Sequence, residues 1–370
     1  FFNVTSTTEI YTLSLHDALP IYAPSEVDVK KTDITENELA GATLQILDSE
    51  GKEVIREWIS GEETGVCKKL AIGKEYILRE AEAPVGYLRA EDIRFKVNEA
   101  GKVVIGEKVQ DTNTITMVDK LQEIELGKVD ADDTSVYVEG AELEVRVASE
   151  DTYTGKEKLA TTILGDTLEW TSETTATKFA GIRPGTYWLV ETAAPSGYTL
   201  AQPVKFTVEA GEESSGTVQI VTIADKQTEV VLTKRFESAT KEEITGMLQD
   251  LALKVVSADG SYTHEVTEDE KNLIADGVTV TLKGLPAGEY YLVETKAPAG
   301  FTIADQISFN VTEKQEQVIV PAMTDTSVKV KISKLDIDTD QFIEGAEFEI
   351  HEKKVRSEEH TSELQSPRYL

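Results

Sequence analysis

The interior of this chain repeats itself, and the repeat constrains the fold more than any other feature of the sequence. Each copy opens with an alternating apolar pattern that ends in a lysine, at residues 27–31, 124–128, 230–234 and 328–334. A glycine opens a second alternating run ten to twelve residues after each lysine. Three copies continue to a Tyr-x-Leu-x-Glu block, followed by Ala-Pro-x-Gly and an aromatic residue. The chain therefore contains three complete modules and the beginning of a fourth.

The repeated segments are predicted to be β-strands, because they alternate with period two, are rich in Val, Ile, Thr and Tyr, and are separated by Gly and Pro. Only a stretch at residues 241–253 also fits a helix. A unit of about 100 residues with several short strands has the size of a β-sandwich. We expect an all-β chain of tandem Ig-like β-sandwich domains, at residues 22–120, 121–226 and 227–326, with the truncated start of a fourth at 327–355. Short linkers favour a linear rod over a flexible string.

The two ends of the chain read differently from the repeats. Residues 1–21 and 356–370 resemble a conceptual translation of sequencing-adapter DNA, and the alternative is a disordered tail at each end. We treat both as non-native, adapter-like tails and leave them out of the fold prediction. Neither tail bears on whether a signal peptide or a C-terminal anchor belongs to the protein.

Charged residues fall on the apolar face of the predicted strands. Side chains two residues apart share one face of a strand, so Val27 and Val29 share the face of Lys31. The opening strands of the other complete copies repeat this relation, as do the Tyr-x-Leu-x-Glu blocks and the closing strands; in the third closing strand we expect Ile319 and Met323 to share the face of Asp325. The residues predicted to point inward are Lys31, Glu80 and Asp119; Lys128, Glu191 and Asp225; and Lys234, Glu294 and Asp325.

A buried lysine, glutamate and aspartate in every module need an explanation, because burying an unpaired charge costs several kcal/mol. One interpretation is an ionic triad without a covalent bond, although such triads often fail to repay their desolvation. The other is covalent. Burial lowers the pKa of a lysine and raises that of a carboxylic acid, so a neutral amine can attack the aspartic acid carbonyl, form an amide and expel water. The glutamate would shuttle the protons.

The lysine strand, the Gly-Ala run, the Tyr-x-Leu-x-Glu and Ala-Pro-x-Gly block and the closing strand resemble tandem Cna protein B-type (prealbumin-like, SpaA-type) domains of Gram-positive surface adhesins and pilins, over roughly residues 25–352. The resemblance implies autocatalytic intramolecular isopeptide bonds Lys31–Asp119, Lys128–Asp225 and Lys234–Asp325, promoted by Glu80, Glu191 and Glu294. It also implies a structural stalk, extracellular and attached to the cell wall. Departures from the pattern concentrate in the third module, at Arg235, Met247 and Pro321, and its bond is the weakest of the three predictions. Lys334 is expected to stay a free amine.

Composition excludes several functional classes. The formal net charge is −31, which disfavours nucleic acid and anionic lipid as partners. One cysteine, Cys67, permits no disulfide within the chain, and the histidines, His16, His264, His351 and His360, show no metal-ligand spacing. No apolar run reaches the length of a membrane helix. We therefore expect no cofactor, no metal, no membrane segment and no enzyme beyond a single self-cross-linking turnover.

Other functions stay open at this point. The modules themselves could bind a host matrix protein or glycan, with the aromatic residues Trp58 and Trp170 as the places to look. The resemblance instead assigns such binding to a tip domain, and peptidoglycan attachment to a C-terminal anchor, both missing from this sequence. Acidic runs at residues 130–133 and 336–340 could bind calcium, although they lack the glycine and distal glutamate of an EF-hand loop and fit solvated turns better.

Overall fold

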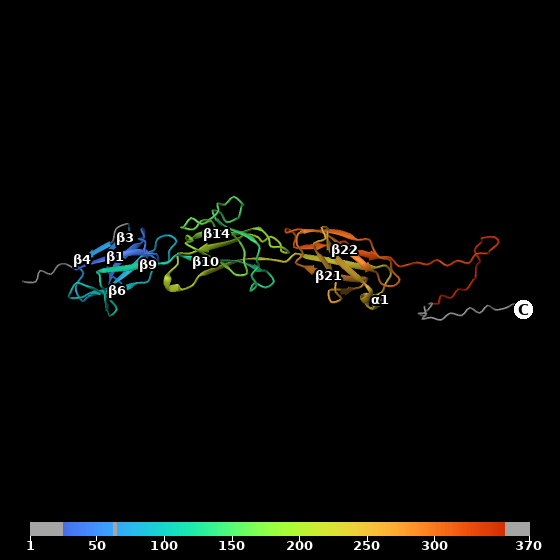
Figure 1. The fold of residues 1–370 in the computed structure, drawn as a ribbon, viewed down its shortest axis with the longest axis horizontal. Coiled ribbons are helices and arrows are strands. Elements are labelled where there is room, and N and C mark those ends of the chain that lie inside the picture. The colour runs from blue at the N-terminus through green and yellow to red at the C-terminus, as the bar shows by residue number, and fades with distance from the viewer. Residues whose placement is uncertain (1–24, 62–64, 352–370) are drawn as a thin grey trace, which may run out of the picture.

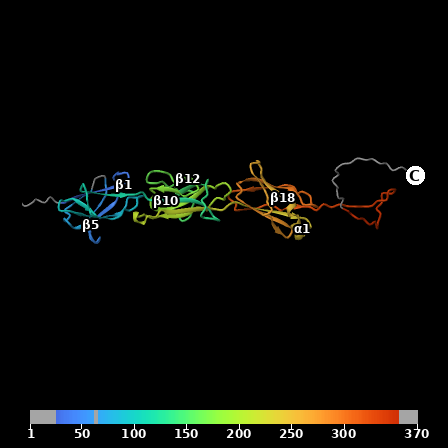
Figure 2. The ribbon, with the colours of Figure 1, turned by 60° about the horizontal axis from the view of Figure 1, so that its bottom comes forward.

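A computed structural model describes residues 25–61 and 65–351, and it contains three β-sandwich modules arranged end to end (Figures 1 and 2). Strands account for almost all of the regular structure, so the prediction of an all-β chain of tandem sandwiches is confirmed. No helix within the described ranges has the length and apolar character needed to cross a membrane. Both adapter-like tails, and residues 22–24, 62–64 and 352–355 of the predicted domains, lie outside the described residues.

Module 1 is a sandwich of two sheets with strand orders β4-β1-β9 and β3-β2-β5-β6-β7-β8. Its strands are β1 (Glu26–Asp33), β2 (Thr43–Asp48), β3 (Val54–Ile59), β4 (Gly65–Lys68), β5 (Glu75–Glu82), β6 (Ile93–Val97), β7 (Val103–Ile105), β8 (Lys108–Val109) and β9 (Thr114–Asp119). Val27, Val29 and Lys31 all point into the core from β1, as the alternation predicted.

Module 2 has the sheets β13-β10-β16 and β12-β11-β14-β15. The strands are β10 (Glu123–Asp130), β11 (Glu142–Val147), β12 (Glu169–Thr171), β13 (Thr177–Ala180), β14 (Gly185–Ala193), β15 (Val204–Val208) and β16 (Gln219–Asp225), with a 3-10 turn, η1 (Glu213–Ser215), before the last. In module 2 the first strand is β10, a central strand of the opposite sheet is β14 and the last strand is β16. They correspond to β1, β5 and β9 of module 1.

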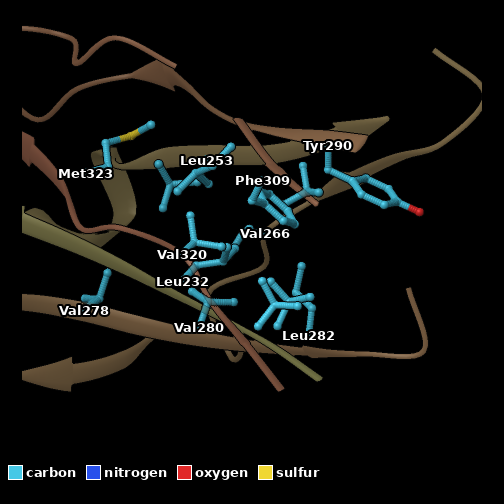
Figure 3. Close-up of a cluster of buried hydrophobic side chains, with 14 of the residues drawn as sticks. Leu232, Leu253, Val266, Val278, Val280, Leu282, Tyr290, Phe309, Val320 and Met323 are labelled. Atoms are coloured by element: carbon cyan, nitrogen blue, oxygen red, sulfur yellow. The ribbon is translucent and has the colours of Figure 1, made fainter. Parts of the chain in front are cut away.

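Module 3 has the sheets β20-β21-β17-β24, with β25 also paired to β17, and β19-β18-β22-β23. The strands are β17 (Glu229–Phe236), β18 (Ala252–Ser257), β19 (Thr263–Glu265), β20 (Asn272–Ile274), β21 (Gly277–Lys283), β22 (Gly288–Lys296), β23 (Ile307–Val311), β24 (Gln317–Ile319) and β25 (Met323–Asp325). Apolar side chains of both sheets meet in its core, where Tyr290 stacks on Phe309 with ring centroids 5.6 Å apart (Figure 3).

The ambiguous stretch of module 3 is a short helix. It consists of α1 (Lys241–Met247) and η2 (Leu248–Asp250), and a capping box joins Thr240 and Glu243 at its start. Gly246 therefore lies inside the helix, and the prediction that it opens the second alternating run was wrong: the strand begins at Ala252. The capping box and the buried Ile244 fix this insertion as a helix against the core.

The first and last strands of each module are parallel neighbours: β1 pairs with β9, β10 with β16, and β17 with β24 and β25. Parallel pairing of the two ends of a chain segment requires a crossover connection. Here that connection contains the whole second sheet together with the antiparallel strands of the first sheet, which are β4 in module 1, β13 in module 2, and β20 and β21 in module 3. The lysine strand and the aspartate strand thus lie side by side, although nearly the whole module separates them in sequence.

One parity prediction was wrong. Ile319 is 72% exposed, whereas Val318 and Val320 are buried. Val231 pairs with Ile319 but Lys234 pairs with Met323, so the last strand gains one residue relative to β17 between β24 and β25. Pro321, which has no backbone N–H to donate, lies in this gap. A one-residue slip exchanges the faces of a strand, which exposes Ile319 while Met323 and Asp325 stay buried.

The fourth copy does not form a sandwich within the described residues. Its predicted opening strand, residues 328–334, forms no β-strand, and the one bridge among the described residues that follow joins Leu335 to Phe342. Val330, Phe342 and Ile350 are exposed. The opening strands of the complete modules all pair with a closing strand, and no such partner lies beside this segment in the described part of the chain. Lys334 is exposed there.

Candidate cross-linking site

The parallel pairing brings each lysine to its predicted aspartate. Lys31 lies opposite Met117 in the β1–β9 register, so Asp119 is two residues farther along and on the same face. Successive residues of a strand rise by about 3.3 Å, and a lysine side chain is long enough to span that diagonal. The other modules repeat this geometry, with Lys128 opposite Ile223 and Lys234 opposite Met323.

The glutamate reaches the same point from the opposite sheet. Glu80 lies on β5 opposite Leu44 of β2, and the register slips by one residue directly beyond this pair, where Thr43 faces Glu82. Corresponding slips follow the Leu143–Glu191 and Leu253–Glu294 pairs. Such β-bulges redirect side chains next to functional sites. All three modules place this bulge beside the glutamate.

The three side chains form a buried triad in every module. The lysine Nζ lies 2.8 Å from Glu80 in module 1, 3.0 Å from Glu191 in module 2 and 2.9 Å from Glu294 in module 3. The same nitrogen contacts Oδ1 of Asp119, Asp225 and Asp325, respectively. None of the nine residues is more than 4% exposed. The structure therefore brings together every predicted site residue, as three separate triads.

A backbone amide that the sequence reasoning missed holds each glutamate. Oε2 of Glu80 accepts a hydrogen bond from the Ala90 N–H at 2.7 Å. Ala201 and Ala304 hold Glu191 and Glu294 in the same way, at 2.7 and 2.8 Å. The signal was present in the sequence, since an alanine stands three residues after the aromatic residue of each Ala-Pro-x-Gly motif. This bond fixes the carboxyl so that it faces the lysine.

Burial changes the acid–base chemistry of the triads. It raises the pKa of Asp119 and of Asp225 from 3.8 to about 7, against the opposing effect of the neighbouring lysine and with help from the nearby glutamate. Burial likewise raises the pKa of Glu294 in module 3. With a pKa of about 7, Asp119 and Asp225 keep a proton near neutral pH, and a protonated carboxyl is the electrophile that amide formation requires.

The aspartate carboxyls are also incompletely satisfied. Oδ2 of Asp119 and of Asp325 has no hydrogen-bond partner among the described residues. A buried, ionised oxygen without a partner costs more than a neutral one. This favours the protonated form of these two aspartic acids, which is the electrophile in amide formation.

The aromatic residues considered for ligand binding are engaged in packing. Trp58 is half-buried against the core of module 1, with the Arg56 guanidinium 5.0 Å from its ring centroid. Trp170 is half-buried against the core of module 2, where Phe179 meets it edge-on at 4.9 Å. Neither forms an exposed aromatic platform.

The acidic turns use their carboxylates internally. Asp130 accepts hydrogen bonds from the backbone N–H groups of Asp132 and Asp133, and Asp336 does the same for Asp338 and Thr339. These bonds lower the pKa of both carboxyls, in Asp130 against a burial effect that is larger than any one of them. Among the residues that the structure describes, no group of three or more His, Cys, Asp or Glu side chains could hold a metal ion.

Comparison with known proteins identifies the modules. A sequence profile described as "SpaA: Prealbumin-like fold domain" matches residues 25–111, 122–227 and 233–326. No curated protein sequence matches the chain.

Several solved structures are similar to the chain at low sequence identity. The Bacillus anthracis TIE protein is 20% identical, with a TM-score of 0.41, over 82% of this chain and 51% of its own length. A streptococcal ancillary pilin is 15% identical, with a TM-score of 0.34, over 83% of this chain and 99% of its own. BcpA, the major pilin subunit of Bacillus cereus, is 14% identical, with a TM-score of 0.31, over 83% and 100%. The chain thus spans about half the length of the TIE protein.

The three profile matches together cover most of the chain, and each falls on one of the β-sandwiches built around a buried triad. The chain belongs to the SpaA prealbumin-like fold family, as three tandem domains.

Proposed function

We propose that the chain is the stalk of a bacterial surface adhesin or pilin, and that each module is closed by an isopeptide bond between its lysine and its aspartate. The observation that carries the proposal is the triad itself: amine and carboxyl are in contact, almost free of solvent, in all three modules. Binding of a host matrix protein or glycan, and attachment to peptidoglycan, are assigned in this proposal to parts of the protein outside the three modules.

The proposed reaction needs only groups that the triad holds. The neutral amine of Lys31 attacks Cγ of the protonated Asp119, and the C–N bond forms as the carboxyl hydroxyl leaves. Glu80 takes a proton from the attacking nitrogen and returns it to the hydroxyl, so that water departs and the glutamate is regenerated. Contact between the reacting groups supplies the high effective concentration that free amine and acid lack.

The proposed bonds would strengthen the modules against force. Each joins the first strand to the last, across separations of 88, 97 and 91 positions in modules 1, 2 and 3. Closing loops of this length stabilises a fold by about 4 to 5 kcal/mol in the chain-entropy estimate used for disulfides. Tension that enters through the first strand and leaves through the last passes through the bond, so the rest of the module carries no load.

Stretching single molecules tests the stalk function. The native chain should show no unfolding of its three modules, because each loop is closed. Lys31→Ala should lengthen the stretched chain by up to about 300 Å, the extended length of the freed segment of module 1. Lys30→Ala is the matched control, since Lys30 is the adjacent, exposed residue of the same strand, and it should leave the extension unchanged. Native modules that unfold fully under force would contradict the proposal.

A further inference from the structure

The linkers are the three residues that follow each acceptor aspartate, at residues 120–122, 226–228 and 326–328, and they form the first, second and third junctions. Each linker pairs with the Ala-Pro-x-Gly loop of the module that precedes it. The glycine carbonyl of the loop accepts a hydrogen bond from the backbone N–H of the residue three positions after the aspartate. The aromatic residue of the loop forms a β-bridge with the residue two positions after the aspartate. The backbone hydrogen bonds run from the N–H of Gln122 to Gly86 (2.9 Å), from that of Thr228 to Gly197 (2.9 Å) and from that of Val328 to Gly300 (2.8 Å). The β-bridges are Tyr87–Leu121, Tyr198–Gln227 and Phe301–Ser327. The linkers are therefore short β-pairings.

At the second junction the loop also contacts the next module. The Leu200 N–H donates to the carbonyl of Glu313, in module 3, at 2.8 Å. The corresponding bond at the first junction joins Arg89 to the carbonyl of Gly211, in module 2, at 3.0 Å. One loop thus binds both the linker and the module that follows it.

The same loop continues directly into the triad. Ala201, the residue after Leu200, donates to Glu191 at 2.7 Å. On the other strand, Asp225 is followed at once by Lys226, whose carbonyl accepts the Thr199 N–H at 2.9 Å. Both carboxyl groups of the module 2 triad are therefore attached to backbone that module 3 and the linker hold in place.

We propose that each module completes the cross-linking site of the module before it, and that Thr228 is a positioning residue for the reaction in module 2. Thr228 is 1% exposed. Its hydroxyl donates to the Leu285 carbonyl of module 3 at 2.6 Å and lies 3.3 Å from the Gly197 carbonyl of the loop. The inference rests on the proposed isopeptide function. It adds that the rate of bond formation in one module depends on the contacts at its junction with the next module.

The first junction uses a different side chain for the same purpose. Gln122, which corresponds to Thr228, is 6% exposed, and its Nε2 donates to the Glu209 carbonyl at 2.5 Å. The third junction lacks this feature, because Val328 has an apolar side chain that is 54% exposed. A buried polar residue at this position is thus present where a complete module follows.

The test follows cross-linking of each module in the full chain. Chain recovered from inclusion bodies in urea, with its mass verified as uncross-linked, is refolded by dilution, and the Lys31–Asp119 and Lys128–Asp225 peptides are quantified against time by mass spectrometry. Thr228→Val should slow module 2 about tenfold and leave module 1 unchanged. The variant removes the hydroxyl contacts to Leu285 and Gly197 that hold the loop on which the position of Glu191 depends. Gln122→Ala should slow module 1 and spare module 2. Thr228→Ser, which keeps the hydroxyl, should restore the native rate.

A second pair of variants tests the junction through the backbone. A Cβ on Gly197 would lie 2.5 Å from the Gly284 carbonyl of module 3, whereas a Cβ on the equivalent Gly300 meets nothing within 4 Å. Both glycines have positive φ, +85° and +91°, so alanine strains the two loops alike. Gly197→Ala should slow module 2, and Gly300→Ala should leave the Lys234–Asp325 rate of module 3 within about twofold of native.

The outcomes separate the two proposals. Native rates in both Thr228→Val and Gly197→Ala would overturn the role of the junction and leave the isopeptide function standing. Equal slowing of modules 1 and 2 by Thr228→Val would also overturn it, because the effect would then be general destabilisation. A native chain that never loses water in any module would overturn the isopeptide function and, with it, this inference.

Discussion

The acceptor aspartates differ from the other acids of this chain because of where they lie. Asp259 is solvent-exposed and accepts hydrogen bonds from Ser257 and Ser261, which lower its pKa to about 2. Asp225 is buried, and this burial raises the pKa of its carboxyl to about 7. The chain carries 68 Asp and Glu residues. Only those acids that keep a proton near neutral pH can act as electrophiles toward an amine.

The pH dependence of cross-linking follows from this shift. Burial raises the pKa of Asp225 above its ordinary 3.8, so the folded module keeps the proton up to about pH 7 and loses it as the pH rises further. The rate of Lys128–Asp225 bond formation on refolding should therefore fall above pH 7, approaching roughly tenfold per unit. The measurement is the cross-linked peptide yield against time between about pH 5 and 9.

An ordinary exposed lysine would behave in the opposite way, because a higher pH frees more of its amine. A module 2 rate that increases steadily from pH 6 to 9 would therefore contradict the account. Asp225→Asn is the control for the acceptor: its side chain does not titrate and would release ammonia, so its profile should lack the fall above pH 7.

Individual residues show what the sequence could and could not predict. Alternation alone was enough to direct Lys128, Glu191 and Asp225 inward, because strand geometry leaves two faces to choose from. It could not give the Ala201 amide that holds Glu191, because that bond crosses from a loop to a strand and depends on three-dimensional closure. Periodicity carries no information about such contacts.

Among the structural elements, the closing strand of module 3 shows how one residue changes the outcome. The extra residue between β24 and β25 exchanges the faces of the strand, and Pro321 was the only sign of it in the sequence. The bulge that follows the glutamate in all three modules is equally invisible to alternation, since a bulge is defined by its partner strand. Strand existence was predictable, and local register was not.

The slip makes a prediction about two adjacent residues. Val320→Asp should destabilise module 3 by more than about 3 kcal/mol, because it buries a carboxylate in the core. Ile319→Asp should change the stability by less than about 0.5 kcal/mol, because that side chain is exposed. Urea unfolding of the two variants, both in a Lys234→Ala background without the proposed bond, measures the difference. Equal losses of unfolding free energy in the two variants would contradict the register slip between β24 and β25.

At the scale of the whole molecule, three modules with separate cores are joined by paired linkers (Figures 1 and 2). The sequence repeat predicted this organisation, because copies of one unit at nearly constant spacing fold alike. It could not predict that each Ala-Pro-x-Gly loop binds the following linker, because the partners lie in different repeats. The function proposed for the whole chain depends on whether the three triads have reacted.

The intact mass of the purified chain measures that directly. We predict a mass lower than that of the plain sequence by three waters, one for each module. Glu80→Ala, Glu191→Ala and Glu294→Ala should each fall short of their own sequence mass by only two. A native mass equal to the plain sequence would show that the triads are ionic and would contradict the cross-linked stalk.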